Sequence, residues 1–208
     1  MVIAIDGPAG AGKSTVARAV AERLGFTYLD TGAMYRCVGL AAAQDSGTPA
    51  GDVAERVAIE LGERVVLDGR DVTAEIRTAE ASEAASHVAA DPAVRAALVR
   101  KQQAIVAVGD WVAEGRDIGA VVAPDAAVKV FLTASPQERA RRRAADLGRP
   151  VQEVLDAQRE RDVRDQTADR STLEAPNDAT PVDTTGLTLE EVVEQVVTLA
   201  VEAKEIQA

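Results

Sequence analysis

The chain has 208 residues, a length that fits one α/β domain with small appendages. Hydrophobic residues make up 47% of it, aromatic residues only 2%, and the formal net charge is −11. This composition disfavours a nucleic-acid partner, because such binding uses base stacking on aromatic side chains or a broad basic face. The single cysteine, Cys37, excludes an intramolecular disulfide and a cysteine-rich zinc site, and His87 alone cannot anchor a catalytic zinc ion.

The N-terminal segment does not have the pattern of a targeting sequence. Met1–Asp6 leads directly into a Gly-Pro pair, with no basic region and no long apolar stretch, so we predict no signal peptide. No segment reaches the roughly eighteen consecutive apolar residues that a membrane span needs. We therefore expect a cytoplasmic protein that contacts no membrane, and we expect it to be a monomer.

Short apolar runs alternate with longer helical stretches along the chain. The predicted strands are Val2–Asp6, Phe26–Leu29, Trp111–Glu114, Val128–Leu132 and Ala179–Asp183. The predicted helices are Ser14–Leu24, Val94–Val108, Pro136–Leu147, Val151–Arg164 and Leu189–Ala203. Strands that alternate with helices predict an α/β fold of three layers, with a parallel sheet and helices on both of its faces.

One segment, residues 64–72, interrupts this alternation. Its pattern predicts a β-hairpin that turns at Asp68-Gly69, and we place it in a small insertion near residues 61–90, outside the main sheet. The turn-forming residues Ser46–Pro49 predict a surface loop, and Leu147–Pro150 predicts the tip between two arginine-rich helices.

Residues 7–14 match the pattern G-x-x-x-x-G-K-[ST] between a predicted strand and a predicted helix. In such a loop, successive backbone N–H groups point at an anion and the helix N-terminus adds its positive dipole end. We expect Lys13 to reach the β- and γ-phosphates as an exposed ligand with no role in the core, and Ser14 to bind Mg²⁺. The motif therefore predicts ATP or GTP. The residues expected to bind this nucleotide are Gly7, Pro8, Ala9, Gly10, Ala11, Gly12, Lys13, Ser14, Thr15, Arg142 and Arg143.

A P-loop alone does not distinguish a kinase from a switch GTPase or a motor ATPase. The N/T-K-x-D tetrapeptide by which GTPases read guanine does not occur in the chain. Val65–Asp68 imitates the strand that ends in the Mg²⁺-binding aspartate of motor ATPases, but Gly69 follows at once and favours the hairpin.

Arginines next to predicted strand ends indicate an acceptor phosphate. Phosphoryl transfer requires an acceptor held in line with the γ-phosphate, and planar guanidinium groups bind phosphates bidentately. Arg36 and Arg116 follow the second and third predicted strands beside glycine turns, at the edge where open α/β sheets bind ligands. We expect both to contact a ligand, whereas Arg141 and Arg159 should lie on solvated helix faces and pair with acidic residues.

Seven segments occur in an order that is specific when they are taken together. They are residues 5–10 (IDGPAG), 28–36 (YLDTGAMYR), 75–78 (EIRT), 114–119 (EGRDIG), 124–126 (PDA), 129–135 (KVFLTAS) and 182–185 (VDTT). With them the chain resembles the bacterial cytidylate kinases, of the P-loop nucleoside monophosphate kinase superfamily, over essentially its whole length.

The resemblance implies a single P-loop kinase domain over residues 1–208. Within it, about 34–100 would form the monophosphate-binding region and about 141–152 a short helical lid. The implied reaction transfers the γ-phosphoryl group of ATP, with Mg²⁺, to CMP and dCMP. The implied catalytic residues are Lys13, Arg116 and Asp117. The residues implied to bind the acceptor nucleotide are Thr31, Tyr35, Arg36, Ser86, Arg95, Arg116, Asp117, Arg161 and Asp165.

The same resemblance divides the acceptor site into two parts. Ser86, Arg95 and Asp117 match positions that read the cytosine edge, and Arg116 matches a position that grips the phosphate. Cytosine presents an amine donor beside two acceptors, so a carboxylate and an arginine together can satisfy that edge.

One arginine of the family pattern is missing from this chain. The residue three positions after Asp165 is Ala168 instead of arginine, and Arg170 is the candidate substitute. Two other functions stay open at this point: a kinase for UMP or a metabolite alcohol, and a regulatory protein whose P-loop only senses ATP. An ADP-release assay across the nucleoside monophosphates distinguishes them.

Overall fold

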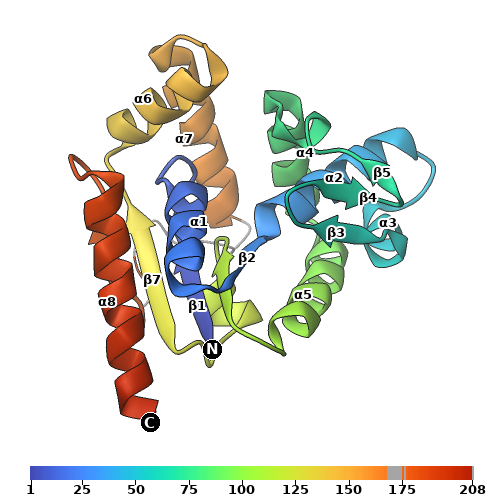
Figure 1. Ribbon diagram of the computed structural model, residues 1–208. Coiled ribbons are helices and arrows are strands. Elements are labelled where there is room, and N and C mark those ends of the chain that lie inside the picture. Colours follow the sequence, from blue (N-terminus) through green and yellow to red (C-terminus); the bar gives the residue numbers. More distant parts are fainter. Residues whose placement is uncertain (168–174, 176, 208) are drawn as a thin grey trace. The chain divides into compact units, whose positions relative to one another are not determined.

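The computed structural model describes residues 1–167, 175 and 177–207 (Figure 1). The chain divides into two compact units, one of Met1–Leu29 with Val106–Ala208 and the other of Asp30–Ile105. No helix within the described ranges combines the length and the apolarity that crossing a bilayer requires.

The first unit contains a five-stranded sheet with the order β2-β6-β1-β7-β8. Its strands are β1 (Val2–Asp6), β2 (Thr27–Asp30), β6 (Trp111–Glu114), β7 (Val128–Thr133) and β8 (Thr180–Asp183). β1 pairs in parallel with both β6 and β7, and β7 with β8. The predicted α/β class is confirmed, and every strand lies within one residue of its predicted bounds. Because β1 is the central strand, the loop after it opens at the carboxyl edge of the sheet, where ligands of such folds bind.

Helices of the first unit pack on this sheet and on one another. They are α1 (Lys13–Leu24), α6 (Pro136–Leu147), α7 (Val151–Thr167), α8 (Leu189–Gln207) and a short π-helical turn, η2 (Ile118–Val122). Val20 of α1 and Val196 of α8 join Ile5 of β1 in one buried core, and α8 runs alongside β7 (Figure 1). Gly148, in a left-handed conformation with φ of 62°, ends α6 before α7 begins. The predicted tip at Leu147–Pro150 is therefore confirmed.

The second unit consists of helices around a small antiparallel sheet. Its elements are α2 (Thr31–Gln44), α3 (Ala50–Arg56), β3 (Ile59–Leu61), β4 (Val65–Leu67), β5 (Arg70–Asp71), the 3₁₀ turn η1 (Glu75–Arg77), α4 (Ala79–Val88) and α5 (Pro92–Val106). β4 and β5 form the predicted hairpin, and Asp68 and Gly69 turn it with φ of 49° and 80°. The hairpin interpretation of Val65–Asp68 is therefore confirmed, since this run lies outside the main sheet.

The sequence analysis did not predict α2, α3, α4 and β3. Helix α2 is rich in alanine and glycine, so its apolar periodicity is weak. Asp30 caps it by accepting the Ala33 N–H at 2.8 Å. The helix packs closely on α4 at Gly39, where a Cβ atom would lie 3.1 Å from the backbone atoms of Ala84 and Ala85. Close contact between small residues therefore contributes to the packing of these two helices.

We expect Gly39→Val to lower the free energy of unfolding by about 1–3 kcal/mol, because the added methyl groups would push α2 away from α4. Ala43→Val, at an exposed position of the same helix, is the control and should change it by about 0.5 kcal/mol or less. Urea unfolding followed by circular dichroism measures both. Equal effects of the two substitutions would contradict the close packing.

Candidate active site

The loop between β1 and α1 has the backbone geometry that anion binding requires. Gly7, Gly10 and Gly12 have φ of 146°, 79° and 89°. A Cβ on Gly7 would lie 2.0 Å from the Leu132 carbonyl oxygen, so no side chain fits there. Ser14 is exposed in the first turn of α1. The loop thus presents backbone N–H groups and a helix N-terminus at the carboxyl edge of the sheet, as the motif predicts.

The expectation that Lys13 is exposed is wrong. Its side chain lies inside the loop, where the residue is 7% exposed and its ammonium group donates to the Pro8 carbonyl at 2.9 Å. Burial, with the positive charge of Arg116 as the second cause, lowers the pKa of Lys13 to about 7. The Lys13 side chain is thus buried by the loop to which it belongs, and the motif alone does not reveal this burial. Phosphates next to this amine would favour its charged form.

Asp6, at the end of β1, connects the phosphate loop to the segment that follows β6. Its two carboxylate oxygens accept the N–H groups of Ile118 and Gly119, each at 2.8 Å. Burial raises the pKa of Asp6 to about 6, while these two hydrogen bonds act in the opposite direction. Asp6 therefore fixes the start of η2 and, with it, the positions of Arg116 and Asp117 directly before that turn. Sequence analysis missed this role. The only signal for Asp6 in the sequence was its place in the segment 5–10.

Several charged side chains gather around Lys13. Arg116, Glu114 and Arg161 all interact electrostatically with its amine. Glu114, the last residue of β6, is 4% exposed and accepts a hydrogen bond from the Tyr28 hydroxyl. The structure thus brings three of the predicted cationic residues close to the phosphate loop, together with the buried carboxylates of Glu114 and Asp6.

Helices α6 and α7 support the outer side of the loop through a buried ion pair. The Arg139 guanidinium donates to the Ala9 carbonyl at 3.0 Å and to both carboxylate oxygens of Asp162 at 3.3 and 2.8 Å. Arg139 is 4% exposed and Asp162 is 8% exposed. Sequence analysis did not predict this pair, because the two residues lie on different helices and no local spacing relates them.

Arg142, predicted to bind ATP, lies beside the loop and is already hydrogen-bonded. It donates to Glu138 and to both the hydroxyl and the carbonyl of Thr184, each at 2.8 Å. One of its terminal nitrogens is 3.6 Å from the position of a Cβ on Gly12. Thr184, which follows β8, also reaches the Ala11 carbonyl at 3.4 Å. Its only signal in the sequence was its place in the segment 182–185.

The predicted acceptor residues that lie in the second unit are Thr31, Tyr35, Arg36, Ser86 and Arg95. Arg36 follows β2 with Gly32 beside its guanidinium, as expected, but it lies on helix α2 rather than in a turn. Its guanidinium pairs with Asp30 at 3.0 Å. Ser86, on α4, is 3% exposed, and its hydroxyl has no hydrogen-bond partner among the described residues. Arg95 is partly exposed on α5.

Other arginines behave as predicted for helix surfaces. Arg141 donates to Glu138 at 2.8 Å, and Arg159 donates to Asp156 at 3.2 Å. Both arginines are exposed, so the expectation of solvated ion pairs is confirmed. Arg143, one of the predicted ATP ligands, is partly exposed on α6.

The remaining predicted positions are Thr15, Asp165, Ala168 and Arg170. Thr15 is exposed in the first turn of α1. Asp165 belongs to α7, but its side chain lies outside the described residues, as do Ala168 and Arg170.

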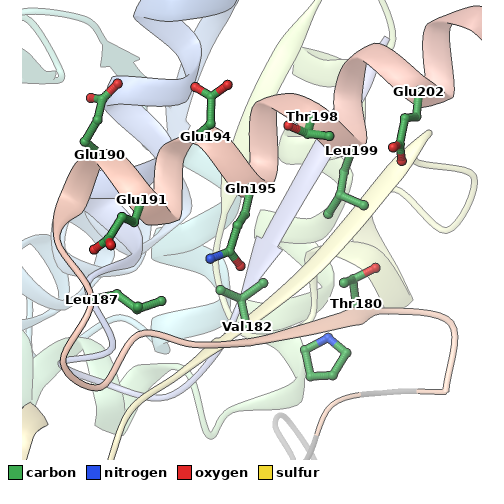
Figure 2. A pocket seen from close by; sticks show the side chains of 11 residues that line it. Thr180, Val182, Leu187, Glu190, Glu191, Glu194, Gln195, Thr198, Leu199 and Glu202 are labelled. Carbon is green, nitrogen blue, oxygen red and sulfur yellow. The ribbon is translucent and has the colours of Figure 1, made fainter.

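A hollow of about 710 Å³ lies between β8 and α8, and no predicted site residue lines it (Figure 2). Figure 2 shows Gln195 and Leu199 of α8 pointing toward Val182 and Thr180 of β8. The helix side of the hollow carries four glutamates: Glu190, Glu191, Glu194 and Glu202. Negative charge of this density repels a triphosphate, so the hollow is excluded as the phosphate site.

A glycine loop of this geometry, between the central parallel strand and a helix and surrounded by cationic side chains, defines a P-loop nucleotide-binding protein. The family model described as cytidylate kinase matches residues 3–202. The chain belongs to the cytidylate kinase family, and the resemblance found in its sequence is confirmed.

Individual relatives agree with this assignment. The chain is 47% identical to the cytidylate kinase of Fervidobacterium nodosum, over 96% of each chain. It is 49% identical to that of Carboxydothermus hydrogenoformans, over 93% of this chain and 94% of the relative. It is 48% identical to the bifunctional pantoate ligase/cytidylate kinase of Prochlorococcus marinus, over 95% of this chain. The chain spans 43% of the length of that bifunctional relative.

Solved structures of low sequence identity share the fold. A gluconokinase from Sinorhizobium meliloti has a TM-score of 0.57 at 18% identity, covering 99% of this chain and 95% of its own. TT1252 from Thermus thermophilus has a TM-score of 0.51 at 23% identity, and the match covers 98% of this chain and 97% of TT1252. At these identities the likeness supports the α/β fold alone.

We expect ATP binding at pH 8 to be accompanied by the uptake of a proton. With a pKa of about 7, Lys13 of the free protein is mostly neutral at pH 8, and the phosphates would favour its charged form. Affinity for ATP should therefore fall as the pH rises above 7. Calorimetry in two buffers of different ionisation enthalpy measures the number of protons taken up.

Lys13→Arg is the control for this experiment, because an arginine stays charged throughout the pH range. This variant should bind ATP without taking up a proton. Binding by the wild type at pH 8 with no proton uptake would show that Lys13 is already charged in the free protein.

Proposed function

We propose that the chain transfers the γ-phosphoryl group of ATP to CMP and dCMP, giving ADP and CDP or dCDP in pyrimidine nucleotide metabolism. The observation that carries the proposal is the grouping of Lys13, Arg116 and Arg161 beside the phosphate loop of a member of the cytidylate kinase family. We further propose that it acts as a monomer in the cytoplasm.

On the donor side, the backbone N–H groups of residues 7–15 would hold the phosphates of ATP. Lys13 would exchange the Pro8 carbonyl for the β- and γ-phosphates. Ser14 suits a magnesium site because its hydroxyl is exposed in the first turn of α1, and Mg²⁺ keeps several waters and needs few protein ligands. When bound, the ion would neutralise charge on the β- and γ-phosphates.

On the acceptor side, Arg116 would hold the monophosphate and Asp117 would read the base. The anchoring of η2 by Asp6 supports this division, because it fixes two adjacent residues whose side chains then serve different ends of one nucleotide. The buried hydroxyl of Ser86, which has no hydrogen-bond partner in the described part of the chain, supports a role in ligand recognition. The other proposed acceptor contacts are Thr31, Tyr35, Arg36, Arg95, Arg161 and Asp165.

The reaction itself needs little covalent chemistry from the protein. Positioning of the two phosphates and neutralisation of the charge on the transferred group would account for catalysis, with no obligatory general base. Lys13, Arg116 and the arginines Arg142 and Arg143 would stabilise that charge.

Two parts of the chain would control access to this site. We assign monophosphate binding to the compact unit Asp30–Ile105, whose limits are close to the expected 34–100. The hairpin of α6 and α7, which has a small apolar core of its own, would carry the lid at about 141–152. Its closure would exclude water and suppress hydrolysis of ATP.

We expect Asp117→Asn to reduce kcat/KM for CMP by about tenfold to a hundredfold and to narrow the preference over UMP. Asparagine keeps the size but replaces one acceptor by a donor, and only cytosine presents an amine at that edge. An ADP-release assay with CMP, dCMP and UMP measures the change. A proportional loss with CMP and UMP would make Asp117 a catalytic or structural carboxylate.

Arg116→Ala provides the comparison, because every monophosphate carries the group that Arg116 would hold. This variant should lower kcat/KM for CMP, dCMP and UMP by similar factors. An effect confined to CMP would contradict the assignment of Arg116 to the phosphate.

A further inference from the structure

A buried glutamine of α7 lies directly against the phosphate loop. Gln158 is 7% exposed. Neither Nε2 nor Oε1 of its amide has a hydrogen-bond partner among the residues that the structure describes. A Cβ atom built on Gly10 would lie 2.7 Å from Nε2. The amide is therefore aimed at the glycine in the middle of the loop.

A polar residue at this position needs an explanation. Burying an amide without hydrogen bonds is unfavourable, and leucine or methionine would fill the same space without polar atoms. Val154 and Leu155, about one turn earlier on α7, are apolar and build the small core shared with α6. The amide of Gln158 thus points to a hydrogen-bond partner that the loop does not offer in its present conformation.

The hydrogen bonds of the loop indicate what that partner is. The Pro8 carbonyl accepts both the Lys13 ammonium, at 2.9 Å, and the Ala11 N–H, at 3.4 Å. The Ala11 N–H is therefore turned into the loop. A trans peptide unit holds its N–H and C=O on opposite sides, so the Gly10 carbonyl, in the same unit, faces out of the loop.

The preceding peptide unit already has such an arrangement. The Ala9 carbonyl points outward and accepts a hydrogen bond from Arg139 at 3.0 Å. The outward Gly10 carbonyl comes next along the loop, at the residue whose built Cβ lies 2.7 Å from Nε2 of Gln158.

We propose that Gln158 is a positioning residue of the donor site that acts through Gly10. Its Nε2 donates to the Gly10 carbonyl when ATP occupies the loop, and this hydrogen bond holds the Ala11 N–H toward the phosphates. The inference rests on the binding of ATP at the P-loop.

Gln158→Met tests the proposal, because methionine keeps the length and apolar volume of the side chain and removes the amide. The melting temperature of the nucleotide-free variant should equal or exceed that of the wild type, since an unpaired buried amide is lost. Its Kd for ATP with Mg²⁺, measured by calorimetry without CMP, should rise about tenfold, or about 1.4 kcal/mol. The KM for CMP at saturating ATP should not change.

Gln102→Met is the matched control. Gln102 is 2% exposed, its Nε2 also lacks a partner among the described residues, and it lies on α5 of the other unit. This variant should bind ATP with wild-type affinity. Gln158→Leu also removes the amide without adding a charge, so it should weaken ATP binding as well and serves as the test if Gln158→Met does not fold.

An ATP affinity within twofold of the wild type in Gln158→Met would overturn the proposal, as would equal losses in the Gln158 and Gln102 variants. A lower melting temperature of the free protein with unchanged ATP affinity would assign Gln158 a purely structural role. A wild-type protein that fails to bind ATP would contradict the proposed function itself, and this inference with it.

Discussion

The buried carboxylate of Asp6 holds the two parts of the phosphate site in one frame. It ends the central strand β1, which leads directly into the phosphate loop, and it accepts the first two N–H groups of η2 at 2.8 Å. Arg116 and Asp117 directly precede η2, so one side chain determines where they lie relative to the loop. Placing a carboxylate in this buried position raises its pKa to about 6, and the two backbone hydrogen bonds offset part of that cost.

Other polar contacts support the loop from the α6–α7 hairpin and from the end of β8. Arg139 and Arg142 donate to Ala9 and Thr184, and Thr184 in turn contacts Ala11. These side chains bind backbone carbonyls of the loop, either directly or through Thr184. The N–H groups of the loop therefore stay available for phosphate. Helix α6, which carries part of the proposed lid, is thus hydrogen-bonded to the loop itself. Removing one partner from the buried pair of Arg139 and Asp162 would leave an uncompensated charge next to that loop.

Sequence reasoning succeeded where the signal is local. Buried parallel strands are short apolar runs bounded by turn residues, and the spacing of Gly7, Gly12 and Lys13 is fixed by the geometry of a phosphate loop. It failed where tertiary contacts decide the outcome. Helix α2 depends on the close approach at Gly39, and Lys13 is surrounded by charged residues that are distant in the chain, such as Glu114 and Arg161. The roles of Asp6, Arg139 and Gln158 likewise come from residues that are distant in the chain.

The most direct test of the account is kcat/KM for CMP in Asp6→Asn. Asparagine preserves the size of the side chain but turns its amide NH₂, a donor, toward one of the two N–H groups that begin η2. We expect a fall of about a hundredfold, because Arg116 and Asp117 lose their position relative to the loop. The Kd for ATP should change much less, since the loop N–H groups are intact. A folded Asp6→Asn variant with kcat/KM for CMP within twofold of the wild type would contradict the account.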